Sequence, residues 1–526
     1  MQHSALGLRG AVTAPHRLAA LAGRDVLEAG GTAIEAMVAS AATIAVVYPH
    51  MNGIGGDAFW LIRRAGEAPI AISGAGRAAA LATPERYAGR GFAEIPARGP
   101  DAALLVPGAV SSWQLALEAD PANRMPFASL LAPAIRYARE GSATTGSQSR
   151  LASSRRAELA GVPGFDEVFL PGGEPPAPGQ RFVQPRLAET LEHLATHGPR
   201  SFYDGEIAAA HARFLTEIDA PLRAADFAGY AAERVTPLST RLRVGEIFNL
   251  PPPTQGIAAL MILALFDRLG VAEAEGFAHV HGLVEATKAA YRLRNRHLGD
   301  PDAMGEGPAE WLQPAFLDRL AAGIDRDRAT PWPEPAVLGD TIWMGAADSS
   351  GTVVSFIQSL FWEFGSGVTC PETGVVFENR GAGFALRPGP NQLAPGKRPF
   401  HTLNPALALF DDGRAMAYGT MGGEGQPQTQ AALFSRYGLL GTPLQQAISA
   451  PRWLLGKTWG DANTRLKLEA RLAPDLVAAL AAAGHDTESV GPYEDMMGHA
   501  GAVVLHPDGH FEAATDPRAD GAALAF

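Results

Sequence analysis

The second half of the chain contains three pairs of short, strand-like segments, and a tight turn joins the members of each pair. These pairs cover residues 341–359, 406–419 and 502–514, with Ser-Ser-Gly, Asp-Asp-Gly and Pro-Asp-Gly at their turns. Turns of this kind close two-stranded hairpins. Helical patterns at 429–438 and 472–483 lie between the hairpins. The sequence therefore predicts an antiparallel sheet that is covered by helices.

The first half of the chain is predicted to be mainly helical. Residues 18–47 carry helix-like apolar spacing, but the Gly30-Gly31 pair should divide them into two helices, the second capped by Thr32. That second helix is almost entirely apolar, so we expect it to be buried. Residues 58–63 are expected to form a strand, and residues 110–330 are expected to be mostly helical.

Composition limits the classes of partner. The 526 residues are 47% hydrophobic and 19% charged, which is typical of a globular protein. Lys and Arg number 43 against 55 Asp and Glu, a net charge of -12 that argues against nucleic acid or anionic membranes as partners. Cys370 is the one cysteine, which excludes an intramolecular disulfide. We find no secretory signal and no apolar stretch of about 20 residues, so a cytoplasmic location is expected.

Several short motifs occur in a characteristic order along the chain. They are Ala14-Pro15-His16, Gly30-Gly31-Thr32-Ala33, Pro49-His50, Gly53-Ile54-Gly55-Gly56, Pro251-Pro252-Pro253, Asp340-Thr341, Phe364-Gly365-Ser366-Gly367, Lys397-Arg398-Pro399, Gly422-Gly423 and Asp516-Pro517-Arg518. Together they resemble the γ-glutamyltransferase family of N-terminal nucleophile hydrolases. The resemblance implies an α+β fold, a four-layer αββα sandwich. It also implies a precursor that cuts itself into a large chain, 1–340, and a small chain, 341–526, which share one core.

Thr341 has the central role in this resemblance. A threonine hydroxyl is a poor nucleophile until a base takes its proton. A cut between Asp340 and Thr341 would free an α-amine beside the hydroxyl, and an amine with a pKa of about 8 can act as that base at neutral pH. Without the resemblance, Thr341 would be an ordinary β-branched residue at the start of a strand.

The same resemblance assigns three further catalytic positions. Gly422 and Gly423 match the two residues whose backbone N–H groups form the oxyanion hole, where glycine lets the backbone approach the substrate. Ser359 matches a threonine that forms a hydrogen bond with the nucleophile, and serine can do the same.

Substrate-binding residues are predicted on both sides of the cut. Arg77 matches the arginine that holds the substrate's α-carboxylate through its guanidinium fork, although a surface salt bridge is the usual role of an arginine. His401 and Thr402 replace a pair of serines and can still donate hydrogen bonds. Arg380 adds a positive charge where the family often has Gln or Glu.

Two departures concern the substrate's ammonium group. Phe361 and Gly383 stand where the family holds that group, and neither can pair with it. The pattern predicts hydrolysis of a small carboxylate-bearing amide that lacks an α-amine. The oxamate amidohydrolase branch of the family fits this description, and glutaryl-type acylases fit as well. Residues 384–397 are also too few for the family's lid loop, and an open site favours hydrolysis over transfer to an amine.

Two alternatives stay open: a glutathione hydrolase or transpeptidase, and a non-catalytic binding homologue. No cofactor or metal is expected. The pairs His193/His197 and His279/His281 lack the pattern of a zinc protease and are expected to pack or to lie at the surface. The expected partners are a small-molecule substrate and the two chains of one precursor, with a dimer of such heterodimers left open.

Overall fold

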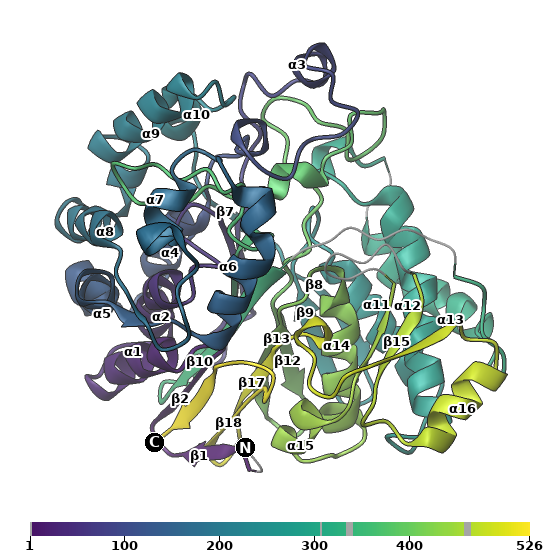
Figure 1. Ribbon diagram of the computed structural model, residues 1–526. Coiled ribbons are helices and arrows are strands. Elements are labelled where there is room, and N and C mark those ends of the chain that lie inside the picture. The colour runs from purple at the N-terminus through teal and green to yellow at the C-terminus, as the bar shows by residue number, and fades with distance from the viewer. Residues whose placement is uncertain (1–2, 306–307, 333–339, 457–463) are drawn as a thin grey trace.

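Two antiparallel sheets stack face to face at the centre of the protein, and helices cover both outer faces (Figure 1). The computed structural model describes residues 3–305, 308–332, 340–456 and 464–526. Within these residues each of the two central sheets has seven strands. The arrangement is a four-layer αββα sandwich, so the predicted α+β fold is confirmed.

The first sheet, called the β10 sheet, has the strand order β19 (Ala522–Ala525), β2 (Gly10–Ala14), β10 (Asp340–Asp348), β11 (Val353–Phe361), β3 (Asp57–Arg63), β4 (Ile70–Gly74) and β7 (Glu233–Val235). The second, the β13 sheet, has the order β1 (Ala5–Gly7), β18 (Phe511–Thr515), β17 (Ala500–Leu505), β13 (Ala415–Thr420), β12 (Ala406–Phe410), β9 (Gly245–Asn249) and β8 (Leu238–Leu242). All three predicted hairpins are present, as β10–β11, β12–β13 and β17–β18. Strands from before and after residue 340 lie side by side in both sheets.

Helices enclose each sheet from outside. The side of the β10 sheet carries α1 (Arg17–Glu28), α2 (Ala33–Val47), α4 (Ala109–Glu118), α5 (Phe127–Glu140) and α8 (Pro185–His197). The side of the β13 sheet carries α11 (Gly256–Arg268), α12 (Phe277–His297), α14 (Gln426–Phe434) and α16 (Pro474–Ala482). The smaller elements are α3 (Pro84–Gly89), α6 (Gly146–Leu159), α7 (Phe165–Phe169), α9 (Glu206–Glu217), α10 (Ala224–Ala228), α13 (Pro314–Ala322), α15 (Leu444–Ser449), β5 (Ser142–Ala143), β6 (Arg181–Phe182), β14 (Trp453–Leu455), β15 (Leu466–Glu469) and β16 (Thr487–Val490).

Strand residues alternate between two apolar cores. On β11, Val354 and Phe356 pack under the helices, whereas Val353 and Ile357 pack between the sheets. Side chains on a strand point alternately to its two faces, so a strand in the middle of the sandwich needs apolar residues at nearly every position. This continuous apolar run fixes β11, and with it the residues that follow, deep inside the molecule.

Predictions for the helical half are mostly confirmed. Residues 18–47 divide into α1 and α2, and Thr32 caps α2 in a reciprocal capping box with Glu35. The structure differs at 233–249, where β7, β8 and β9 extend the two sheets. These strands have only three to five residues, too few for their alternation to stand out in the sequence.

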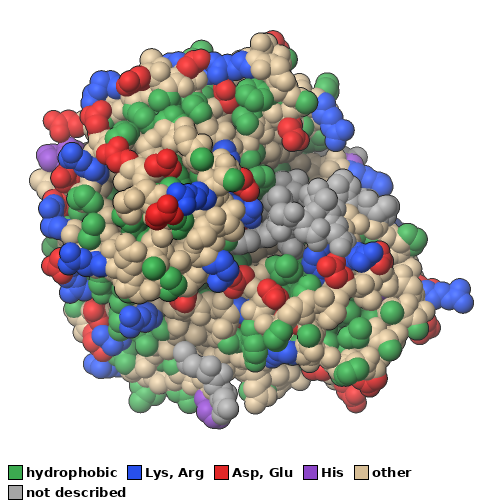
Figure 2. All heavy atoms as spheres, viewed as in Figure 1, with side chains coloured by type: hydrophobic (Ala, Val, Ile, Leu, Met, Phe, Trp, Pro, Cys, Tyr) green, Lys and Arg blue, Asp and Glu red, His purple; other side chains and the backbone are tan. Residues whose placement is uncertain are grey.

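The surface is mixed in charge. On the face shown in Figure 2, acidic and basic side chains are interspersed and do not gather into one patch. Among the described helices, none combines the length and the apolar character that crossing a bilayer requires.

Candidate active site

Thr341 is the second residue of β10, and only 1% of its surface is exposed. A β-bulge lies opposite, because β11 has one extra residue between the partners of Asp340 and Ile342. The Thr341 hydroxyl donates to Ser359 Oγ at 3.2 Å, and Ser359 Oγ also accepts from the N–H of Phe361 at 2.8 Å. The structure therefore brings together Thr341 and Ser359. The side chain of Asp340 lies outside the described residues.

Gly422 and Gly423 follow β13, at the turn that leads into α14. Both have positive φ, 119° and 52°, in the region that favours glycine. Among the described residues, no backbone group accepts a hydrogen bond from either N–H. The two sheets are close here, since a side chain at Gly419 would collide with the indole of Trp343 on β10. Both N–H groups are thus left available by the fold.

A buried network of polar side chains is hydrogen-bonded to the turn at Gly422 and Gly423. Gln255 Nε2 donates to the carbonyls of Gly423 and Thr402, at 2.8 Å each. Arg294 on α12 donates to Gln255 Oε1 at 2.7 Å and also pairs with the carboxylate of Glu424. The network ties the glycine turn to the loop that carries Thr402. Sequence reasoning missed Gln255 and Arg294, although Gln255 lies only two residues after the proline motif.

Arg380 is buried, with 1% of its surface exposed, and its guanidinium stacks 3.6 Å from the centre of the Phe361 ring. Its Nη1 donates to Thr402 Oγ1 at 3.0 Å. Nε and Nη2 have no hydrogen-bond partner among the described residues. Burial lowers the pKa of Arg380 to about 9, while nearby carboxyl groups, Asp57 first, oppose that shift. The site therefore contains a buried cation with two donors to spare.

His401 and Asp57 form a second buried pair beside this cation. His401 Nε2 donates to Asp57 Oδ2 at 2.8 Å, while His401 Nδ1 accepts from the N–H of Leu403 at 3.3 Å. Burial lowers the pKa of His401 to about 4, against the opposing effect of Asp57, so the imidazole is neutral at neutral pH. Asp57 Oδ1 accepts from the N–H of Gly76 at 2.8 Å. Asp57 was not predicted, although an acidic residue at the start of a buried strand was a usable signal.

Arg77 follows Gly76, whose N–H donates to Asp57, but the side chain of Arg77 pairs with Glu233. Its Nη2 pairs with the carboxylate of Glu233, and its Nη1 donates to the carbonyl of Gly396 at 3.1 Å. The side chain is 36% exposed. Glu233 also contacts Arg398 at 3.1 Å. The Arg77 side chain is therefore hydrogen-bonded to Glu233 and Gly396 and not to Asp57 or His401.

Gly383 and Arg380 share one volume of space. A Cβ at Gly383 would lie 2.9 Å from Arg380 Nη2, closer than such contacts normally come. A side chain at this position would therefore compete with the guanidinium for space. Both departures at the expected ammonium position, Phe361 and Gly383, thus contact the same cation.

A cavity of about 580 Å³ opens next to these residues. Its lining includes Gly383, Phe400, Arg294 and Glu424, together with part of the short segment that follows Gly383. The cavity approaches Arg380 through Gly383, which lines it and lies beside the guanidinium.

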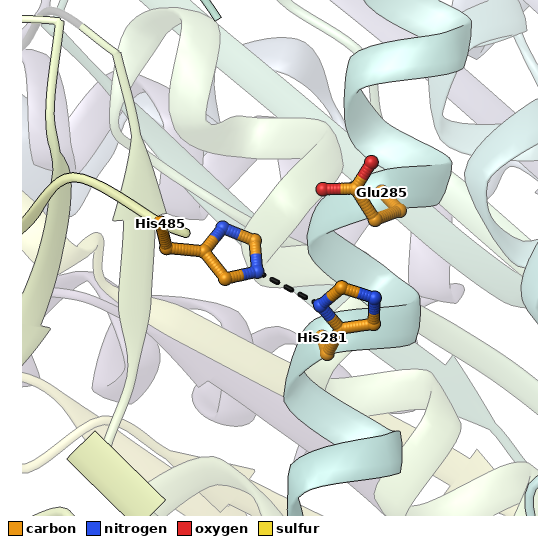
Figure 3. A group of neighbouring side chains, drawn as sticks. All are labelled: His281, Glu285 and His485. Atoms are coloured by element: carbon orange, nitrogen blue, oxygen red, sulfur yellow. Dashed lines mark hydrogen bonds between the residues drawn. The ribbon is translucent and has the colours of Figure 1, made fainter. Parts of the chain in front are cut away.

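A separate cluster could offer donor atoms to a metal ion: His281 and Glu285 on α12 and His485 after α16 (Figure 3). His281 Nδ1 lies 2.9 Å from His485 Nε2, and His281 Nε2 lies 2.9 Å from the carbonyl of Asp325. Because a carbonyl oxygen can only accept a hydrogen bond, His281 Nε2 must carry the proton of the ring. His281 Nδ1 then accepts a hydrogen bond from His485 Nε2. Glu285 accepts from the Lys288 ammonium at 2.6 Å, and this charge opposes a divalent cation. We interpret the cluster as a hydrogen-bonded network.

The other histidines that the sequence analysis assigned to packing or to the surface occupy such positions. His279 is buried and contacts Ser435 Oγ at 2.9 Å. His193 and His197 stack on each other along α8, with ring centres 4.2 Å apart.

The four-layer αββα sandwich is the fold of the N-terminal nucleophile hydrolases. The model of the family "Gamma-glutamyltranspeptidase" matches residues 19–526, and the chain belongs to that family. It is a hydrolase of this class.

Similar proteins span the whole chain. The chain is 51% identical to "Oxamate amidohydrolase proenzyme" of Klebsiella pneumoniae subsp. pneumoniae, with 100% of each chain covered. It is 38% identical to "Glutathione hydrolase-like YwrD proenzyme" of Bacillus subtilis, again over 100% of each. Among solved structures, cephalosporin acylase from Bacillus halodurans superposes with a TM-score of 0.92 at 31% identity, covering 100% of this chain and 97% of that one.

Proposed function

We propose that this protein is a self-processing threonine amidohydrolase whose substrate is a small amide that carries a carboxylate. In the precursor, the Thr341 hydroxyl attacks the carbonyl of Asp340, and hydrolysis of the resulting ester separates residues 1–340 from 341–526. Both parts contribute strands to each sheet, so the two chains stay together in one shared core. The names of the relatives, both called proenzymes, support this step.

Turnover then uses the amine that the cut has freed. The α-amine of Thr341 takes the proton of its own hydroxyl, and Oγ1 attacks the amide carbon. The N–H groups of Gly422 and Gly423 stabilise the developing oxyanion, and Ser359 holds the nucleophile in position. Collapse of the intermediate expels the amine, which takes the proton, and leaves an acyl ester on Thr341. Water hydrolyses this ester and releases the carboxylic acid.

Arg380 carries the assignment of the substrate class. A buried charge with unused donors is costly, and a planar carboxylate would satisfy Nε and Nη2 together. In oxamate the carboxylate is bonded directly to the amide carbon, so its binding group must lie next to the nucleophile. This requirement favours Arg380, because it stacks on Phe361, whose N–H is hydrogen-bonded to Ser359 Oγ. The relative named oxamate amidohydrolase supports the same substrate.

Two other substrates remain candidates. Longer dicarboxylic acyl amides are favoured by the similarity to cephalosporin acylase, and the cavity of about 580 Å³ offers space for them. Glutathione is favoured by the name of the Bacillus subtilis relative. Its ammonium group would, however, meet the cation of Arg380, so we place it last.

A panel of amides tests this order. Ammonia release is measured from oxamate, and amine release from glutaryl and γ-glutamyl amides, with the same enzyme. We expect oxamate to be turned over fastest. Faster turnover of the γ-glutamyl amide would overturn the proposal in favour of a glutathione hydrolase.

The nucleophile is tested by Thr341→Ala, with Thr341→Ser as the matched control that keeps a hydroxyl. On a denaturing gel we expect Thr341→Ala to remain one full-length band and to lose turnover completely, whereas Thr341→Ser should still be cut. Wild-type protein that hydrolyses amides at full rate as one uncut chain would contradict the mechanism. A wild-type chain that stays uncut and inactive would indicate a binding homologue.

A further inference from the structure

Glu378 is a buried acidic residue to which the mechanism above gives no role. Its surface is 1% exposed, and its backbone N–H donates to the carbonyl of Gly55 at 3.0 Å. Neither side-chain oxygen accepts a hydrogen bond from a described residue. Gly76 passes close by, since a Cβ there would lie 3.0 Å from Glu378 Oε1. A carboxylate in this position would be both desolvated and without donors, which is strongly unfavourable.

Asp57 is the neighbour that resolves this conflict. The side chains of Glu378 and Asp57 both lie against Gly76, and a hydrogen bond between the two carboxyl groups requires that one of them carry a proton. Asp57 already accepts from the N–H of Gly76 and from His401 Nε2, both at 2.8 Å. These two donors stabilise Asp57 as the anion. The proton therefore belongs on Glu378.

We propose that Glu378 is a neutral carboxylic acid that donates its proton to Asp57 and thereby leaves Arg380 free to bind the carboxylate of the substrate. This inference rests on the function proposed above and makes Glu378 a positioning residue. With Glu378 neutral, Asp57 and Arg380 balance each other in charge. An ionised Glu378 would add a second anion beside Arg380 and would compete with the substrate for it.

The surroundings of Glu378 agree with a neutral form. Burial, followed by the charge of Asp57, raises the pKa of Glu378 well above its ordinary value, and Arg380 only partly opposes this. His401 is neutral at neutral pH because burial lowers its pKa to about 4. Burial also raises the pKa values of Tyr203 and Tyr230, which sense the charge of Glu378, so both stay protonated. Arg380 is thus the positive group that faces Glu378 within the described residues.

The protonation state has a consequence for stability. In the unfolded chain Glu378 would lose its proton near its ordinary pKa, whereas in the fold it keeps that proton to higher pH. Since the folded state then binds more protons, the free energy of unfolding falls as pH rises through this interval. Glu378→Gln keeps a donor for Asp57 and cannot ionise. The variant should therefore lack this contribution to the decrease in the free energy of unfolding with rising pH.

Infrared difference spectroscopy tests the proton directly and needs no turnover. In the spectrum of the processed wild-type enzyme minus that of Glu378→Gln, we expect the carbonyl band of a protonated carboxylic acid at neutral pH. This band should vanish as the pH is raised. If only an ionised carboxylate signal is found at neutral pH, the inference is wrong, whatever the enzyme hydrolyses.

Kinetics test the link to Arg380. For the best amide of the panel, we expect the KM of the wild type to rise about tenfold per pH unit once Glu378 ionises, with little change in kcat. In Glu378→Gln this rise should be absent or should begin at higher pH. A rise of equal size at the same pH in both enzymes would show that Glu378 does not control Arg380. If the acid band is present but the protein cleaves no amide of the panel, the protonation of Glu378 is supported and the proposed function is rejected.

Discussion

Arg380 lies near the buried Asp57, and Arg77 directly follows Gly76, whose N–H donates to Asp57, but the two arginine side chains have very different surroundings. Arg380 is fully buried, stacks on an aromatic ring and keeps two donors unused among the described residues. Arg77 is 36% exposed and its charge is already matched by Glu233. Both residues were predicted to bind the substrate. From this contrast we infer that a buried arginine is suited to bind a substrate when donors of its guanidinium have no hydrogen-bond partner in the protein.

Free energy explains the difference. The desolvation cost of a buried cation is best offset by an anion that is hydrogen-bonded to it, and among the described residues the nearby Asp57 makes no such bond with Arg380. An incoming carboxylate would do so. For Arg77, a substrate carboxylate would first have to displace Glu233, and exposed pairs of this kind contribute little either way. We therefore expect Arg380 to dominate carboxylate recognition.

The largest effect should come from Arg380→Met, which removes the charge and keeps much of the volume. Loss of one partner from a buried, hydrogen-bonded charge pair costs about 2–5 kcal/mol, or about 30- to 5,000-fold in kcat/KM. Arg380→Lys is the matched control, since it keeps a positive charge but loses the planar guanidinium fork. Its kcat/KM should lie between those of the wild type and Arg380→Met. Steady-state kinetics with oxamate measures the effect. A loss below about fivefold in Arg380→Met, the range of an exposed pair, would remove Arg380 from substrate binding.

A carboxylate built into the site should act next most strongly. Gly383→Asp places an acidic side chain against Arg380 Nη2, where it can take the donors meant for the substrate. Since hydrogen bonds to charged groups contribute about 1.5–3 kcal/mol, we expect kcat/KM to fall about 10- to 150-fold. Gly383→Ala adds steric pressure without charge and should have a smaller effect. Equal losses in both variants would mean that space, not charge, matters at this position.

The sequence predicted the parts of the molecule whose signals are local. Hairpin turns, the break at Gly30-Gly31 and the cap at Thr32 each depend on a few neighbouring residues, and all were found. The contact between Thr341 and Ser359 was predicted from the family resemblance, and the two residues lie on the paired strands β10 and β11 of one hairpin. Strands β7 to β9 were missed because each is too short to show a period.

The group around Arg380 could not be derived in the same way. Asp57, Glu378 and His401 come from three distant parts of the chain, and each alone has an ordinary interpretation as a surface or packing residue. Their chemistry arises only when folding removes water from all of them together and leaves fewer donors than acceptors. The sequence suggested a cation at 380 and an absent side chain at 383, but not that the guanidinium occupies the space beside Gly383.

The smallest effect is expected for Arg77→Gln. This variant tests whether Arg380, and not Arg77, binds the substrate carboxylate. The side chain keeps a polar end, and loss of its half-exposed pair with Glu233 should cost about 0.2–1 kcal/mol, so kcat/KM for oxamate should fall by no more than about fivefold. Glu233→Gln is the matched control, because it removes the same ion pair from the other side. If Arg77→Gln loses as much activity as Arg380→Met while Glu233→Gln does not, Arg77 must release Glu233 to hold the substrate. In that case the partner seen in the structure marks the resting state of a binding group, and burial alone does not identify the arginine that recognises the carboxylate.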